Sequence, residues 1–142
     1  MERMLEQFGG EVQFVLYIFA LRESSNIAAQ VALCAGEQGK FWEMHRMIYE
    51  RQASWNRLQN PLPTLLQYAT DVPLDAVALE RCVQSGRMRG LIAADKALGK
   101  GLQVQSTPTV FINGQRIVGA QPEYEYTRVI RQELARARRV AQ

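Results

Sequence analysis

Residues 12–19 show the clearest alternation of apolar and polar positions in the first part of the chain. Val12, Phe14, Leu16 and Ile18 hold the apolar positions, and apolar residues also fill the positions between them toward the end of the run. A period of two is typical of a β-strand, and a run that becomes apolar on both faces is typical of a strand covered by helices. We therefore predict a buried strand at residues 12–19.

The segment "STPTVFINGQRIVGAQP", residues 106–122, predicts a β-hairpin. Two short runs of β-prone residues flank Asn113-Gly114, and this dipeptide tolerates the two positive φ angles of a type I′ turn. Pro108 lies at the entrance of the first run, where a residue without an N–H group is tolerated. Because X-Pro bonds are cis in only about 5–6% of cases, the pattern alone favours a trans Thr107–Pro108 bond.

Between these two segments, apolar residues recur every three or four positions, which is the period of amphipathic helices. We expect about five helices there, after a helical turn at residues 2–8, and one more helix after the hairpin. Asp75 and Ser85 are expected to cap two of them, and Ser24, Ser25 or Asn26 the first. The inner face of the last helix is expected to hold Tyr126, Ile130, Leu134 and Ala137.

The length of 142 residues and a hydrophobic content of 47% predict one compact domain, and the order of a strand, about five helices, a hairpin and a helix predicts an α/β layer fold. The net charge is +3, and arginines gather toward the end of the chain. We expect them on the solvated face of a terminal helix, where cations suit the C-terminal end of the helix dipole, and we expect no nucleic-acid partner because no reader motif accompanies them. They are Arg128, Arg131, Arg136, Arg138 and Arg139.

The apolar segments are too short for a membrane span. The longest, residues 14–21, falls well short of the about 20 residues that a span needs, and Glu2 and Glu6 make the start unlike a secretory signal. We therefore expect no membrane partner.

Few side chains suited to metal or nucleophilic chemistry are present. The chain has two cysteines, Cys34 and Cys82, and one histidine, His45, whereas a structural zinc site built from Cys and His usually takes four such ligands. We expect no metal and no cofactor. His45 lies on or beside the packed face of its helix, so a structural histidine is the favoured interpretation, with a catalytic one as the alternative.

Several motifs together resemble the DsbA-like branch of the thioredoxin superfamily. They are "VALCAGEQGKFWEMHRMIYERQ" (31–52), "LERCVQSGR" (79–87) and "ALGKGLQVQSTPTVFINGQRIVGAQP" (97–122). The resemblance implies an α/β thioredoxin-like fold with an inserted α-helical domain, all within one domain, residues 1–142. Residues 1–22 and 102–142 would form the thioredoxin-like part, and residues 23–101 the inserted helical part.

The resemblance also implies a polypeptide-binding site at Ser106, Thr107 and Pro108. In that family the Thr–Pro bond is cis, and the loop binds an extended substrate polypeptide by strand addition. The family's catalytic C-x-x-C, at the N-terminus of the first helix, is absent here, as is the first strand: the alignment places Met1 inside the catalytic helix. We therefore assign no catalytic residue in this chain.

The missing first strand has a consequence for partners. In the family this strand lies between residues 12–19 and the first strand of the hairpin, and both would otherwise expose unpaired main-chain groups. We expect the two strands to close on each other or a partner to supply a strand, either a second copy in a homodimer or another chain.

The resemblance leaves three alternatives for Cys34 and Cys82: a structural disulfide between inserted helices, two free core thiols, or a working redox pair. For the whole chain we expect a truncated DsbA-like protein thiol-disulfide oxidoreductase, redox-inactive as given. The alternative is a non-enzymatic peptide- or protein-binding module. The family is mostly periplasmic or extracytoplasmic, whereas the compartment of this chain is undetermined by its sequence.

Overall fold

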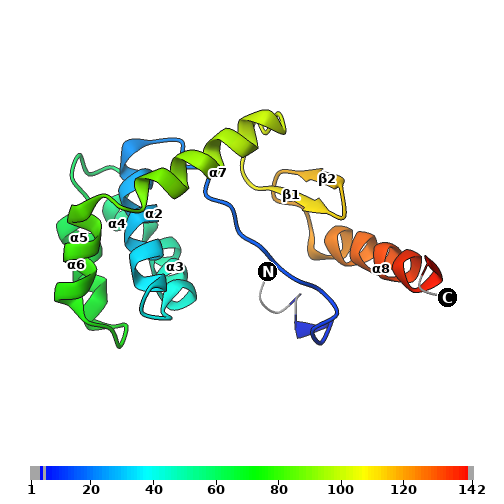
Figure 1. Ribbon diagram of the computed structural model, residues 1–142, viewed down its shortest axis with the longest axis horizontal. Coiled ribbons are helices and arrows are strands. Elements are labelled where there is room, and N and C mark those ends of the chain that lie inside the picture. The colour runs from blue at the N-terminus through cyan, green and yellow to red at the C-terminus, as the bar shows by residue number, and fades with distance from the viewer. Residues whose placement is uncertain (1–3, 5, 141–142) are drawn as a thin grey trace. The chain divides into compact units, whose positions relative to one another are not determined.

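The computed structural model describes residue 4 and residues 6–140, and it divides the chain into two compact units (Figure 1). The helical unit is Tyr17–Gly99, and the hairpin unit consists of the chain up to Leu16 together with the chain from Lys100 onward. The predicted domain division at residues 22/23 and 101/102 stays a prediction. The elements are α2 (Glu23–Gly36), α3 (Phe41–Glu50), α4 (Gln52–Trp55), α5 (Leu62–Gln67), the 3₁₀ helix η1 (Tyr68–Thr70), α6 (Ala76–Ser85), α7 (Arg89–Gly101), β1 (Thr109–Ile112), β2 (Gln115–Val118) and α8 (Glu123–Val140).

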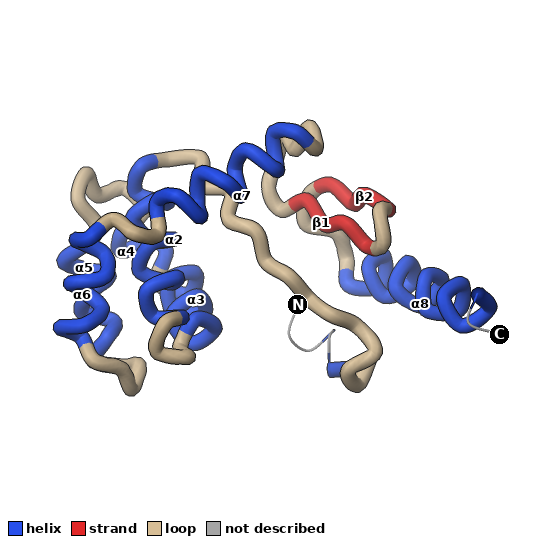
Figure 2. Tube along the Cα trace, in the orientation of Figure 1, coloured by secondary structure: helices blue, strands red, loops and turns tan. Residues whose placement is uncertain are grey.

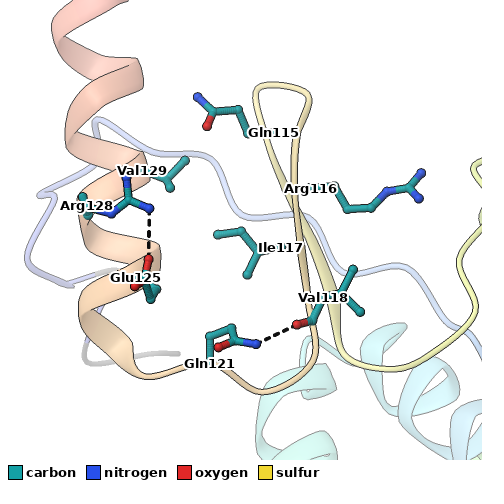
Figure 3. Close-up of a pocket in the computed structure, with 8 residues that line it drawn as sticks. All are labelled: Gln115, Arg116, Ile117, Val118, Gln121, Glu125, Arg128 and Val129. Carbon is teal, nitrogen blue, oxygen red and sulfur yellow. Dashed lines mark hydrogen bonds and ion pairs between the residues drawn. The ribbon is translucent and has the colours of Figure 1, made fainter.

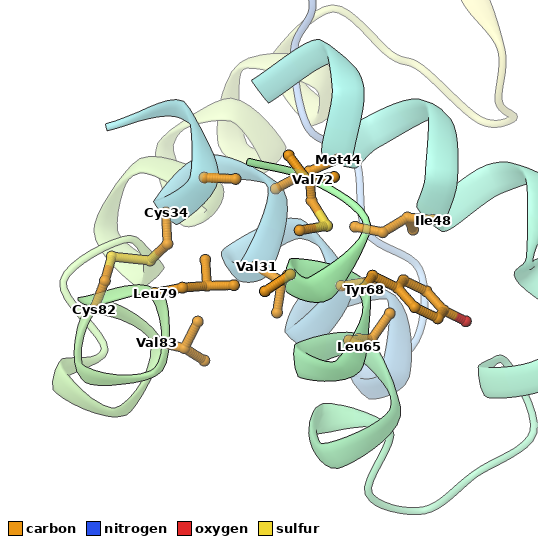
Figure 4. Close-up of a cluster of buried hydrophobic side chains, with 14 of the residues drawn as sticks. Val31, Cys34, Met44, Ile48, Leu65, Tyr68, Val72, Leu79, Cys82 and Val83 are labelled. Carbon is orange, nitrogen blue, oxygen red and sulfur yellow. A yellow bond between two sulfur atoms is a disulfide. The ribbon is translucent and has the colours of Figure 1, made fainter. Parts of the chain in front are cut away.

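The core of the helical unit is formed by the inward faces of α2, α3, α5 and α6 (Figure 4). Met44, Leu65 and Leu79 are fully buried in it. A disulfide joins Cys34 on α2 to Cys82 on α6, with their Cα atoms 5.8 Å apart. Close-packed apolar side chains of this kind carry most of the stability of short helices.

The helix caps agree only in part with the sequence. The carboxylate of Asp75 accepts hydrogen bonds from two main-chain N–H groups at the start of α6, at 2.9 and 3.0 Å, so this cap is confirmed. Ser85 as a cap is wrong, because it is the last residue of α6, and α7 begins only at Arg89. The cap predicted at Ser24, Ser25 or Asn26 is also wrong, since α2 already begins at Glu23.

The helical unit begins and ends at one place, which we call its base. The main-chain N–H of Ile18 donates to Asp95 Oδ2 at 2.8 Å. The ring of Phe19 lies against Gly99, where an added Cβ would be 2.7 Å from the ring carbon Cδ2. At such a distance the Phe19 ring would have to move to make room, so glycine is the residue that fits at position 99 without a shift.

The predicted strand at residues 12–19 is wrong. Among the described residues the sheet contains β1 and β2 alone, and residues 13–20 follow an irregular path without a strand (Figure 2). The exposure of the side chains still alternates along residues 11–18. A strand requires a neighbouring strand as well as an alternating sequence, and the described sheet, which contains β1 and β2 alone, places none beside this segment. Of the helical turn predicted at residues 2–8, residues 2, 3 and 5 lie outside the described residues.

The hairpin is confirmed. β1 and β2 pair antiparallel with Ile112 opposite Gln115, and Asn113 and Gly114 both have positive φ, 46° and 90°, as a type I′ turn requires. Helix α8 covers one face of the hairpin, and Tyr126 and Ile130 pack there. The residues packed around them include Val110, Ile112, Ile117 and Leu134.

Candidate functional site

The loop that precedes β1 holds the three predicted site residues. Ser106, Thr107 and Pro108 are adjacent and all exposed, and the Thr107–Pro108 peptide bond is cis. Two hydrogen bonds hold the loop against the hairpin: Thr109 Oγ1 donates to the carbonyl oxygen of Ser106 at 2.7 Å, and the N–H of Gly119 donates to the carbonyl oxygen of Pro108 at 2.8 Å.

Thr107 lies between these two fixed positions, and its main-chain groups are unused. Within the described part of the chain, neither its N–H nor its carbonyl oxygen takes part in a hydrogen bond, although both neighbouring carbonyls do. An exposed donor and acceptor at one residue can pair with an extended polypeptide.

The outer edge of β1 continues this row of free main-chain groups. Ile112 and Gln115 flank the two-residue turn, which makes them a hydrogen-bonded pair of the hairpin. Hydrogen-bonded pairs recur at every second residue, so the N–H and C=O groups of Ile112 and Val110 point toward β2. Thr109 and Phe111 therefore direct theirs away from β2. The sheet has no further described strand on that side.

A shallow depression of about 220 Å³ lies beside the loop. Arg116 lines it, with its guanidinium 5.1 Å from the centre of the Phe111 ring and Nη2 donating to the carbonyl oxygen of Leu102. The residues around the depression are Gln103, Val104, Gln105, Ser106, Thr109, Arg116 and Val118. Uncharged polar groups predominate, and the lining contains neither cysteine nor histidine.

A second depression, of about 260 Å³, lies between β2 and α8 (Figure 3). The ion pair between Arg128 Nη2 and Glu125 Oε2, 3.0 Å apart, closes one side of it. Gln121 Nε2 donates to the Val118 carbonyl oxygen at 2.9 Å on another side. The polar groups at its rim are therefore already paired, and we assign no chemistry to it.

The cysteines have no accessible sulfur in this structure. Cys34 and Cys82 are 1% and 2% exposed and bonded to each other, so neither is available as a thiolate nucleophile.

His45 belongs to an aromatic cluster on α3, in which its ring lies 5.5 Å from that of Phe41, 5.6 Å from that of Trp42 and 4.8 Å from that of Tyr49. This environment supports the structural interpretation of His45. No three acidic, His or Cys side chains in the described part are grouped so that they would hold a metal ion.

Shifted pKa values occur away from the loop. Two hydrogen bonds lower the pKa of the Glu43 carboxyl. The larger effect comes from a main-chain N–H group, and the next from the side chain of Lys40. A hydrogen bond to the carboxylate of Glu37 raises the pKa of Arg87. Both groups lie in the helical unit, so neither gives the loop an acid or a base.

Three residues that position the loop were missed from the sequence: Thr109, Arg116 and Gly119. For Thr109 a signal exists, because a threonine hydroxyl often bonds to a carbonyl three residues earlier. The bonds from Arg116 and Gly119 join the loop to β2 and to the residue that follows β2. They can be predicted only once the register of the hairpin is known.

In the described part, no helix combines the length and apolar character needed to cross a membrane. Three curated relatives are named as sodium/proton antiporters, and this chain spans less than a fifth of each. Na(+)/H(+) antiporter NhaA 3 of Salinispora tropica is 35% identical over 65% of this chain and 13% of its own length. Na(+)/H(+) antiporter NhaA 1 of Salinispora arenicola is 33% identical over 68% and 14%. Na(+)/H(+) antiporter NhaA of Herminiimonas arsenicoxydans is 25% identical over 87% and 19%.

No solved structure matches the chain at a significant level. The family model described as thioredoxin matches residues 2–132, which include the helical unit, the Ser106–Pro108 loop and most of α8. The loop and the hairpin lie wholly within this match, and so do residues 123–132 of α8. The chain therefore belongs to the thioredoxin family.

Proposed function

We propose that this chain binds extended polypeptides at the Ser106–Pro108 loop, as the substrate-binding part of a DsbA-like protein thiol-disulfide oxidoreductase. The observation that carries the proposal is the free main-chain N–H and C=O of Thr107, exposed between two carbonyls that are already hydrogen bonded. A polypeptide in extended conformation offers the complementary donor and acceptor.

The shape of the loop region supports a sequence-tolerant mode of binding. Main-chain hydrogen bonds give affinity without reading side chains, and the depression beside the loop is shallow and lined mainly by uncharged polar groups. Arg116 is held by Leu102 and Phe111, which limits its freedom to select an acidic side chain. We infer that the bound segment is chosen for being extended and accessible rather than for its charge.

Thiol-disulfide exchange in the family proceeds by attack of a thiolate on a disulfide through a mixed disulfide. In this chain both cysteines are buried in the Cys34–Cys82 bond, so the chain as given is expected to be inactive in that reaction. This same burial favours the second candidate, a non-enzymatic polypeptide-binding module.

The antiporter relatives suggest how a domain similar to this chain is combined with another part in a longer protein. We infer that the stretch similar to this chain is a thioredoxin-like domain joined to the transporting part in those proteins, because it covers only 13%, 14% and 19% of their lengths. Deleting that stretch from the Salinispora tropica antiporter should leave Na⁺/H⁺ exchange in vesicles intact. Loss of exchange in a correctly inserted deletion variant would contradict the inference.

Binding is tested with reduced, carboxymethylated lactalbumin, a permanently unfolded polypeptide, labelled for fluorescence anisotropy. Thr107→Pro removes the free N–H and should weaken binding at least five-fold, the value of roughly one hydrogen bond. Gln59→Pro, the matched control, makes the same change in an exposed loop of the helical unit, at a residue whose N–H forms no described main-chain hydrogen bond, and should bind like the unaltered chain. Equal affinity of all three proteins would refute the assignment of the loop.

The chemistry is tested separately by insulin reduction in the presence of dithiothreitol. The unaltered chain should not accelerate the reaction above background. Acceleration that disappears in Cys34→Ala or Cys82→Ala would overturn the statement that the pair is structural. The two candidate functions are then distinguished by the mass and sequence of the protein isolated from its native cells, since only an oxidoreductase needs a C-x-x-C.

A further inference from the structure

Over residues 126–140, helix α8 has a basic side and a largely apolar side, on which the one acidic residue, Glu133, is buried. With about 100° of rotation per residue, Arg128, Arg131, Arg136, Arg138 and Arg139 fall within an arc of roughly 160°. The apolar residues fall on the opposite side; they are Tyr126, Val129, Ile130, Leu134, Ala137 and Val140.

The last turns of α8 extend beyond the hairpin. Leu134 is the last α8 residue that packs against the buried side chains between the hairpin and the helix. Residues 135–140 are all exposed. Val140 is 82% exposed. Ala137 and Val140 thus continue the apolar side of the helix without anything over them among the described residues, and arginines border them on both flanks.

Most of the positive charge on this side is not neutralised within the chain. Arg128 pairs with Glu125 and Arg138 with Glu11. Arg131, Arg136 and Arg139, which we call the three unpaired arginines, form no ion pair with any described residue. The interaction of cations with the helix dipole is confined to the last turn, so it does not account for Arg131.

We propose that the end of α8 docks on an anionic lipid surface, with the three unpaired arginines at the headgroups and Ala137 and Val140 at the boundary with the acyl chains. A helix that combines an apolar strip with a basic side is suited to lie in the plane of such an interface. The sequence alone led us to expect a solvated face and no membrane partner. The uncovered apolar strip beside unpaired cations favours a lipid surface over nucleic acid, whose backbone offers nothing to Ala137 or Val140.

The test is co-sedimentation of the full chain with vesicles of phosphatidylcholine, with or without phosphatidylglycerol, at low and high salt. The chain should bind only the vesicles that contain phosphatidylglycerol, and less at high salt. The variant R131Q/R136Q/R139Q should bind roughly a hundred-fold more weakly, about five-fold for each arginine. R131K/R136K/R139K keeps the charge and should retain most of the binding.

The matched control is R22Q/R57Q/R81Q, which removes three exposed arginines from the helical unit and should leave vesicle binding unchanged. Circular dichroism checks that each variant is folded. If R131Q/R136Q/R139Q does not fold, R131K/R136K/R139K still tests whether positive charge at these three positions is enough for binding. An equal loss of binding in R22Q/R57Q/R81Q would reduce the effect to net charge and overturn the proposal. Absence of binding to phosphatidylglycerol vesicles, or tighter binding to a duplex oligonucleotide than to those vesicles, would overturn it as well.

Discussion

Reduction of the Cys34–Cys82 disulfide should destabilise the helical unit strongly. The bond connects α2 to α6 across the core, and the two cysteines are separated by 48 positions in the sequence. Breaking it leaves the same atoms in the folded core, so the perturbation acts mainly on the freedom of the unfolded chain.

The magnitude follows from the loop that the bond closes. For a separation of 48 positions, the chain-entropy relation gives a loss of roughly 4 kcal/mol in the free energy of unfolding at 25 °C. A domain of this size has a total stability of about 5–15 kcal/mol. With a urea dependence of about 1–3 kcal/mol per molar, the midpoint of unfolding should fall by roughly 1–4 M.

Trp55 gives the assay a reporter inside the affected unit. It is 4% exposed, and its Nε1 donates to the carbonyl oxygen of Ile48 at 2.8 Å, so its fluorescence should change when the core opens. Urea unfolding is followed with and without a phosphine reductant. The double variant C34A/C82A serves as the control, because its midpoint should not respond to the reductant.

Two results would refute this reasoning. A midpoint that moves by less than about 0.3 M would mean that the bond adds little to stability, in conflict with the loop-entropy relation. Labelling of two free thiols in denatured, unreduced protein would mean that the bond is not formed in solution.

Three further predictions concern single side chains. Tyr126→Phe should lower the free energy of unfolding by about 1–3 kcal/mol, measured by urea unfolding, because its hydroxyl bonds two main-chain groups of the preceding turn, each at 3.0 Å. Asp75→Ala should cost about 0.5–2 kcal/mol in the same assay through loss of the α6 cap, whereas Asp75→Asn should restore most of it. Lys40→Met should raise the pKa of Glu43, measured by NMR titration. The rise should go only part of the way to the ordinary value of 4.5, because the main-chain hydrogen bond is the larger cause of the lowering. Since this pKa is lowered in the folded state, the stability linked to it is present above the ordinary pKa and is lost as the pH falls through the folded value.

The features that the sequence predicted well depend on neighbouring residues. The hairpin follows from Asn113-Gly114, whose backbone preferences select the turn and thereby the register of β1 with β2. The α6 cap follows from Asp75, whose carboxylate reaches N–H groups only two and three residues away. The site residues Ser106, Thr107 and Pro108 came from the family resemblance, and their binding role stays a prediction.

The features that the sequence predicted poorly depend on distant partners. The alternation along residues 12–19 survives as alternating exposure, yet pairing requires a neighbour that no local pattern specifies. Ser85 is a good cap by type, but the left-handed conformation of Gly86, with φ of 68°, ends α6 directly after it. The anchoring of the loop by Arg116 and Gly119 likewise appears only when the hairpin register brings them to it.

The base of the helical unit has a consequence for how much this chain tolerates change. Because Ile18 contacts Asp95 and Phe19 lies against Gly99, the eighty or so residues between them leave the main path of the chain and return to almost the same point, as a long loop does. Insertions in an exposed loop of the helical unit, such as residues 57–60, should therefore be absorbed locally. Gly99 lies against the Phe19 ring at this base, whereas nothing lies within 4 Å of a Cβ added at Gly90 or Gly101, so among the glycines of α7 it is Gly99 where we expect a side chain to be least tolerated.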